Sequence, residues 1–264
     1  MKKTIQFALI SGLTLTGFFA AAGQAEATSL TNSGTVSVIE GTVEPVDPEQ
    51  PITPVDPGDS PSTEGPLRID YVSALNFGEA NSKKKNRVYS ALAQQFHNEI
   101  GPRGSYIQIT DQRATSTGWT LQVKQETQFK NTVIQEAGEQ ELKGAVLSLD
   151  KGWANSSSTS EAPTVMRETI ALDAIGSAYQ VAAAPAGAGR GVWTISFGAS
   201  DTNANHQETT LAPIIDAKGQ AVMDQEYNKP AYSNSAITLS IPETTKIYPV
   251  QYETEITWLL AELP

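Results

Sequence analysis

Two histidines, His97 and His206, are the only imidazoles in this chain of 264 residues. A Ser-His-Asp triad would need one of them held against a serine and a carboxylate. The Gly-x-Ser-x-Gly sequence that presents a nucleophilic serine does not occur. Glycoside hydrolysis needs only two carboxylates facing across a cleft, but nothing in the sequence marks such a pair. We therefore expect no catalytic residue, no cofactor and no enzymatic activity.

Asp201, Asn203 and Asn205 place side-chain oxygens at alternate positions, as a calcium-binding loop begins. An EF-hand loop also needs glycine at its sixth position and glutamate at its twelfth. Those positions hold His206 and Ala212, so the EF-hand interpretation fails. A plain turn rich in Asn and Asp is the simpler interpretation, and a looser calcium site is the alternative. The chain has no cysteine, which excludes disulfides and thiolate metal sites. We predict no metal site.

Trp-x-Leu occurs in two β-prone stretches, once as Trp119-Thr120-Leu121 and again as Trp258-Leu259-Leu260. Successive side chains of a strand point to opposite faces, so the Trp and Leu of each motif share a face, roughly 6.6 Å apart. Such a pair is most often part of a core, but it could also form a binding surface. We expect these two strands, about 140 residues apart in sequence, to frame one domain, with one motif mainly structural and the other nearer the surface.

The N-terminal residues have the pattern of a secretory signal peptide over 1–27. Lys2 and Lys3 precede an apolar run, and Ala25-Glu26-Ala27 supplies the small-x-small cleavage site. We expect a secreted mature chain without a membrane span. Cleavage would change the formal net charge from −11 to about −12, and a chain this acidic repels polyanions, so nucleic acid is not an expected partner.

A short extended segment is expected over residues 28–44 and a linker over 45–66. Between residues 40 and 64 there are seven acidic residues and no basic ones, and proline recurs at every third position from Pro45 to Pro57. Three residues complete one turn of polyproline II. The pattern therefore predicts a disordered but semi-rigid spacer, on the order of 65 Å long, with no core of its own.

Residues 67–264 consist of short β-prone runs between Gly, Asn, Ser and Pro, with apolar residues at alternate positions, as at Leu67, Ile69 and Tyr71. This spacing predicts an all-β domain, a sandwich of Greek-key or jelly-roll type. In one segment Val88 and Leu92 begin a run of apolar residues at every fourth position as far as Ile100. A short helix there remains open beside a strand.

Four further stretches accompany the Trp-x-Leu motifs: Leu75-Asn76-Phe77-Gly78, Asp111-Gln112-Arg113 before Gly118, the glycine-rich run over 187–198, and residues 237–242 followed by Tyr252. With its second Trp-x-Leu motif at the end of the sequence, this ordered set resembles the WxL cell-surface proteins of Gram-positive bacteria. The resemblance covers about residues 66–264.

The resemblance implies a non-catalytic protein that attaches to peptidoglycan, or to another cell-wall polymer, and to other proteins of the WxL surface complexes. Trp119, Leu121, Trp258 and Leu260 would then be the wall- or partner-binding motifs. Because the sequence has no Leu-Pro-x-Thr-Gly sorting signal and no cysteine for lipidation, we expect non-covalent attachment at the cell surface. Adhesion to host matrix proteins is the alternative, and a polysaccharide-acting enzyme is another.

Two further features leave alternatives open. Lys83, Lys84, Lys85 and Arg87 form the single basic cluster, which is either a solvated loop or a contact for anionic wall polymers. Trp153 lies in a stretch rich in Gly and Ser, where it is either a buried loop anchor or an exposed platform for a sugar.

Overall fold

The computed structural model describes residues 44–79, 87–136 and 138–264, all of which belong to one compact unit, Glu40–Pro264. The predicted signal peptide, all but the last residue of the extended segment over 28–44, and Lys83, Lys84 and Lys85 lie outside the described residues. Within the described part every regular element is a strand. No helix that could span a membrane is found in that part of the chain.

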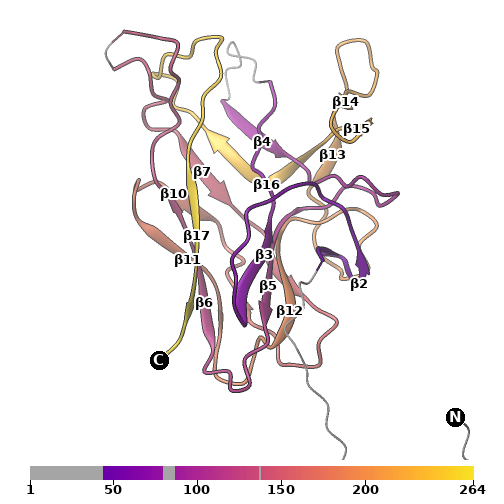
Figure 1. Ribbon diagram of the computed structural model, residues 1–264. Helices are drawn as coiled ribbons and strands as arrows, with labels where there is room; N and C mark the ends of the chain where they lie inside the picture. Colours follow the sequence, from indigo (N-terminus) through magenta and orange to yellow (C-terminus); the bar gives the residue numbers. More distant parts are fainter. Residues whose placement is uncertain (1–43, 80–86, 137) are drawn as a thin grey trace, which may run out of the picture. The chain divides into compact units, whose positions relative to one another are not determined.

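Seventeen strands follow one another along the described residues (Figure 1). They are β1 Val46–Asp47, β2 Gln50–Pro54, β3 Leu67–Val72, β4 Val88–Leu92, β5 Ser105–Asp111, β6 Trp119–Gln125, β7 Val146–Leu149, β8 Gly152–Asn155, β9 Thr164–Val165, β10 Ile170–Leu172, β11 Ala178–Ala184, β12 Gly191–Phe197, β13 Leu211–Pro213, β14 Met223–Asp224, β15 Lys229–Pro230, β16 Tyr232–Ser240 and β17 Ile256–Glu262.

These strands form three main sheets, in which every pairing between strands is antiparallel. The strand orders are β17-β6-β11-β9, β3-β5-β12-β8 and β10-β7-β16-β13, with β4 also paired to β16. The three sheets share one apolar cluster, to which β6, β12 and β7 contribute Leu121, Ile195 and Leu147, all fully buried. The predicted all-β sandwich is confirmed, because sheets that each bury one face must pack against one another.

The short-helix alternative over Val88–Ile100 is wrong. Residues Val88–Leu92 form β4, which pairs with β16 with Leu239 opposite Tyr89. Tyr89 and Ala91 are buried, whereas Val88, Ser90 and Leu92 are half-buried. Burial in this segment therefore has the two-residue period of a strand, and the four-residue spacing of apolar residues extends beyond the end of β4.

The prediction of a free polyproline spacer over 45–66 is also wrong, because these residues are part of the folded domain. β1 and β2 form a hairpin, and the side chains of Asp47, Glu49 and Val55 are buried. Farther on, the Thr63 amide donates to the carbonyl of Ile69 in β3 (2.9 Å). Proline is compatible with this arrangement because it is tolerated on edge strands and at strand ends, where no neighbouring strand requires a hydrogen bond from the missing N–H.

This N-terminal segment covers the face of β5 that points away from the main core. All seven residues of β5 are buried. On one side Ile107 and Ile109 join the main cluster, while on the other Tyr106 forms a second cluster with Val55, Tyr71 and Phe96. β5 is therefore covered on both faces of its sheet, and residues 44–66 form one of the two covers.

Candidate functional site

The two Trp-x-Leu motifs lie side by side in one sheet. β17 pairs with β6 over the whole length of both strands and without a bulge, placing Trp258 opposite Val123, Leu260 opposite Leu121, and Glu262 opposite Trp119. Strands about 140 residues apart in sequence thus become neighbours, as Figure 1 shows for the yellow C-terminal strand and magenta β6.

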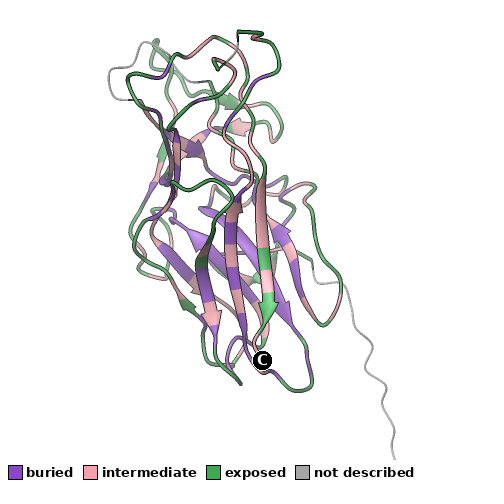
Figure 2. Cartoon of the chain, turned by 90° about the vertical axis from the view of Figure 1, so that its left-hand side faces the viewer, coloured by how far each residue is buried: buried purple, intermediate pink, exposed green. Residues whose placement is uncertain are grey.

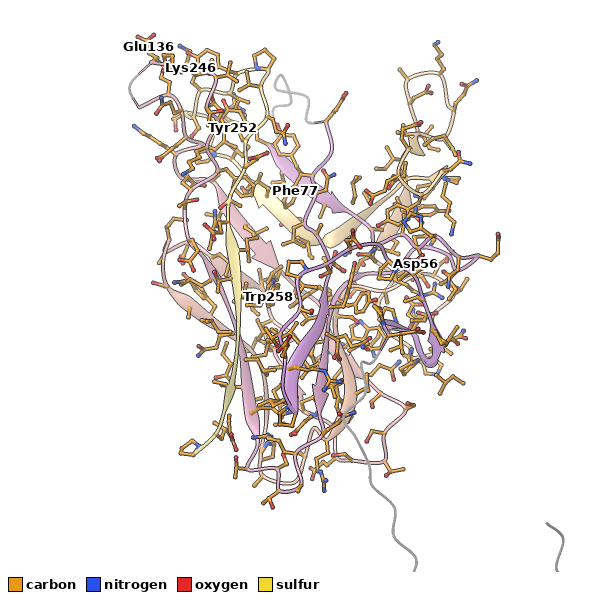
Figure 3. The ribbon with its side chains drawn as sticks, in the orientation of Figure 1. Asp56, Phe77, Glu136, Lys246, Tyr252 and Trp258 are labelled. Carbon is orange, nitrogen blue, oxygen red and sulfur yellow. The ribbon has the colours of Figure 1, made fainter. Side chains whose placement is uncertain are left out.

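The side chains of both motifs face the core, but to different depths. Residues directly opposite in an antiparallel pair project from the same face of the sheet. Trp119 and Leu121 have no exposed surface, whereas Trp258 and Leu260 are half-buried and pack against the same cluster. Trp258 lies between β17 and β3 (Figure 3), with its ring centroid 6.5 Å from that of Phe197.

Trp119 is held in a pocket formed by the glycine-rich run. Its indole Nε1 donates a hydrogen bond to the carbonyl of Gly189 (3.2 Å). Gly189 has a φ of +66°, and a Cβ atom there would lie 2.7 Å from that Nε1. A side chain at residue 189 would therefore collide with the indole and strain the backbone. The glycine-rich run over 187–198 and the first Trp-x-Leu motif therefore pack against each other.

The Asp111-Gln112-Arg113 motif connects the start of β6 to the end of β17. Arg113 binds Asp111 through two hydrogen bonds of 2.9 and 2.8 Å and donates to the carbonyl of Gly118 at 3.0 Å. Its remaining nitrogen, Nη1, lies 2.7 Å from a carboxylate oxygen of Glu262. The guanidinium therefore bridges the turn before Trp119 and the last residue of β17. Sequence reasoning missed Glu262, whose position opposite Trp119 depends on the register.

The carboxyl group of Asp111 contributes a pH dependence to stability. Burial alone would raise its pKa, but hydrogen bonds from Arg113 and Ser116 outweigh burial and hold the pKa below its ordinary value of 3.8. A depressed folded-state pKa stabilises the fold above the unfolded-state pKa, and this contribution is lost as pH falls through the folded-state value. We expect the melting temperature of the native protein to fall more steeply below about pH 4 than that of Asp111→Asn.

Melting curves recorded at successive pH values between neutrality and pH 3 would test this expectation. Asp111→Asn should be less stable than the native protein near neutral pH, and the difference should shrink in acid. A difference that stays constant across the whole range would contradict the assignment of the ion pair.

Of the predicted basic cluster, only Arg87 lies within the described residues. Its Nη1 donates to the carbonyls of Pro242 and Thr245, at 3.1 and 2.6 Å. Arg87 therefore braces the chain that follows β16. Contact of the cluster with anionic polymers stays a prediction.

Trp153 is not an exposed sugar platform. It lies in β8, is 4% exposed, and donates from Nε1 to the carbonyl of Gly198 (2.9 Å).

In the loop after β12, the Asn203 side chain bonds to the backbone of Ser200 and Gln207, as in a turn braced by its own side chains. Within the described ranges, no group of three or more His, Cys, Asp or Glu residues is arranged to hold a metal.

The surface that the two motif strands present to solvent is the opposite face of the same sheet. It is formed by residues that alternate with the core residues of three strands, namely Thr120, Gln122 and Lys124 of β6, Thr257, Leu259 and Ala261 of β17, and Ala178, Gln180 and Ala183 of β11. All are half-buried or exposed. We call these nine residues the outer face.

The family described as WxL domain surface cell wall-binding matches residues 25–264. No match was found among curated proteins or among solved structures.

Proposed function

Because the chain belongs to the family of WxL surface cell wall-binding domains, we propose that it attaches non-covalently to peptidoglycan as a non-catalytic part of a surface complex. The family places the protein at the cell wall and cell surface. The match over residues 25–264 is the observation that carries the proposal, since it includes both motifs and the whole described domain.

The outer face is the part of the molecule that we assign to the wall. Trp119 and Leu121 are enclosed by the core, so they act through the sheet that they hold together. Their strand and β17 expose mainly hydroxyl, amide and small apolar groups, which can hydrogen-bond sugar hydroxyls and cover the apolar parts of a glycan. Leu259, which is 38% exposed, is the large apolar residue of this face.

Charge favours this face over others. The protein carries a formal net charge of −11, so its surface as a whole repels a polymer that bears carboxylates and phosphates. None of the nine residues of the outer face is acidic. Its one cation, Lys124, lies 2.8 Å from Glu126. A neutral face reduces the repulsion at the point of contact and leaves binding to short-range interactions.

Co-sedimentation with purified peptidoglycan, with and without teichoic acids removed, tests the proposal. We expect binding to both preparations and about tenfold weaker binding by Leu259→Glu, because a lost contact worth about 1.4 kcal/mol corresponds to a factor of ten. The matched control is Ile52→Glu, which makes the same change of charge at a residue of β2 that is 81% exposed and should bind as the native protein does.

Equal binding by both variants and the native protein would remove the outer face from the wall contact. No sedimentation of the native protein, together with retention on immobilised collagen, would favour the host-matrix alternative. Release of soluble sugar or peptide from the peptidoglycan would favour an enzyme.

A further inference from the structure

β17 is the last strand of its sheet and has a hydrogen-bonded neighbour on one side only. The sheet runs β17-β6-β11-β9, and β3, which approaches β17, does not pair with it. Figure 2 shows β17, which ends near the label C, changing from half-buried to exposed along its length. One long edge of this strand is therefore available for backbone pairing.

The residues of the second Trp-x-Leu motif supply the open edge. The amide of Leu263 donates to Gly118, and the amide of Glu126 donates to the carbonyl of Glu255. Hydrogen-bonded pairs alternate along an antiparallel ladder, so the odd-numbered residues of β17 bond to β6. The N–H and C=O groups of Ile256, Trp258, Leu260 and Glu262 consequently point away from β6. Among the described residues none of them has a backbone partner.

β17 also lacks the features that normally prevent edge strands from pairing. Short length, lysine, proline, a bulge or a covering segment protects most edges. β17 has seven residues, with no lysine, no proline and no irregularity in its register. The other edge strands of the three main sheets are shorter or covered. β9 has two residues, β10 and β13 have three each and β8 has four, β3 is covered by the chain around Thr63, and Leu92 of the five-residue β4 donates to the carbonyl of Asn76.

The geometry points to strand addition at this edge: an extended segment of another polypeptide, with basic residues at its ends, pairs with the outward backbone groups of β17. Four residues of β17 offer an N–H and a C=O in register, which is the ladder that an added strand requires. The added strand would also cover the half-buried side chains of Trp258 and Leu260. This inference is independent of wall binding, because it uses the edge of the sheet and not its outer face.

Charge identifies the class of partner. The exposed carboxylates of Glu253, Glu255 and Glu262 lie at the two ends of the edge. Glu262 is paired with Arg113, whereas Glu253 and Glu255 form no ion pair within the described residues. Lysine or arginine at the ends of an added strand would complement them. A second copy of this chain is disfavoured, since the ends of its own β17 carry glutamates and no lysine or arginine and so offer no cation to Glu253 or Glu255.

Three short acetylated peptide amides that alternate valine and threonine are the probes. The first has lysines at both ends, the second has glutamates there, and the third is the lysine peptide with an N-methyl group on every residue between its ends, so that neither edge keeps an N–H. We expect the lysine peptide to protect the amides of Trp258 and Leu260 from hydrogen exchange, while the amide of Leu259 is protected with or without peptide. The methylated peptide should protect neither, because it cannot form the ladder.

Two variants of the protein form a matched pair. Leu260→Ala and Leu260→Pro both remove the isobutyl group, but only proline removes the outward N–H. The N–H of Leu260 has no partner in β6, so both variants should fold, which their melting curves would verify. We expect Leu260→Pro to bind the lysine peptide about tenfold or more weakly than Leu260→Ala does.

Equal affinity of the two variants, or equal binding of the N-methylated and unmethylated lysine peptides by the native protein, would overturn strand addition. The methylated-peptide comparison needs no variant, so it holds even if Leu260→Pro does not fold. Binding of the glutamate peptide as tight as that of the lysine peptide would overturn the basic partner. A dimer in sedimentation velocity that Leu260→Pro abolishes would assign the edge to a second copy and overturn the proposal.

Discussion

Replacing Trp119 with alanine is expected to lower the free energy of unfolding by about 3–5 kcal/mol, the usual cost of deleting a buried tryptophan side chain. The indole has no exposed surface, and its removal leaves a cavity between β6 and the glycine-rich run. The carbonyl of Gly189 also loses its hydrogen-bond donor. Because no wall polymer can reach this side chain, any loss of wall binding by Trp119→Ala should follow from unfolding alone.

The stability of Trp119→Ala should be compared with that of Trp258→Ala. Trp258 is half-buried on an edge strand, so its removal should cost about 1–3 kcal/mol. Urea unfolding of both variants beside the native protein would measure the difference, provided the slope against urea concentration is unchanged. A Trp119→Ala protein as stable as the native one, or a larger loss for Trp258→Ala, would contradict the assignment of the first motif to the core.

The strands could be predicted largely from local pattern, whereas their partners could not. Alternation of apolar residues indicated a β-domain, and β6 follows it, with Trp119, Leu121 and Val123 buried and the residues between them half-buried. Burial with a two-residue period is a property of each strand alone. The pairing of β6 with β17, and hence the ion pair between Arg113 and Glu262, depends on a register between distant segments that no local pattern encodes.

For the candidate site, the resemblance supplied the two motifs, but only the folded structure distinguishes how deeply each one is buried. A Trp and a Leu two residues apart have the same pattern whether a sheet is central or at an edge. Trp119 lies on a strand with neighbours on both sides, whereas Trp258 lies on the last strand of the sheet. Position in the sheet therefore decides which indole is enclosed, and it follows from topology.

The failure of the spacer prediction over 45–66 has a physical cause. Composition indicates whether a segment can build a core of its own, and this segment, rich in proline and acidic residues, cannot. It instead adds Val55 to an apolar cluster supplied mostly by other strands. Other parts of the domain supply buried partners for the carboxylates of this segment. Arg103 binds Asp47, and Ser200 donates to Glu49 through both its amide and its hydroxyl, at 2.7 and 2.6 Å.

Arg103 holds Asp47 through two parallel hydrogen bonds of 2.8 and 2.9 Å, and Asp47 is 1% exposed. Replacing Asp47 with alanine removes the main partner of a buried guanidinium, leaving the carboxylate of Glu49 at 3.4 Å and the carbonyl of Pro102 at 3.2 Å. Breaking a buried ion pair in this way typically costs about 3–5 kcal/mol, so we expect Asp47→Ala to be destabilised by an amount of that order.

Asp59→Ala is the matched control, because Asp59 belongs to the same acidic segment but is exposed, and its replacement should change stability by no more than about 0.5 kcal/mol. The double variant Asp47→Leu with Arg103→Met should recover part of the loss, since it removes both charges of the pair while Glu49 keeps its hydrogen bonds from Ser200. If the segment were a free spacer, both single alanine variants would unfold at the same urea concentration as the native protein. A midpoint that falls for Asp47→Ala and not for Asp59→Ala would instead make residues 44–66 a structural part of the domain.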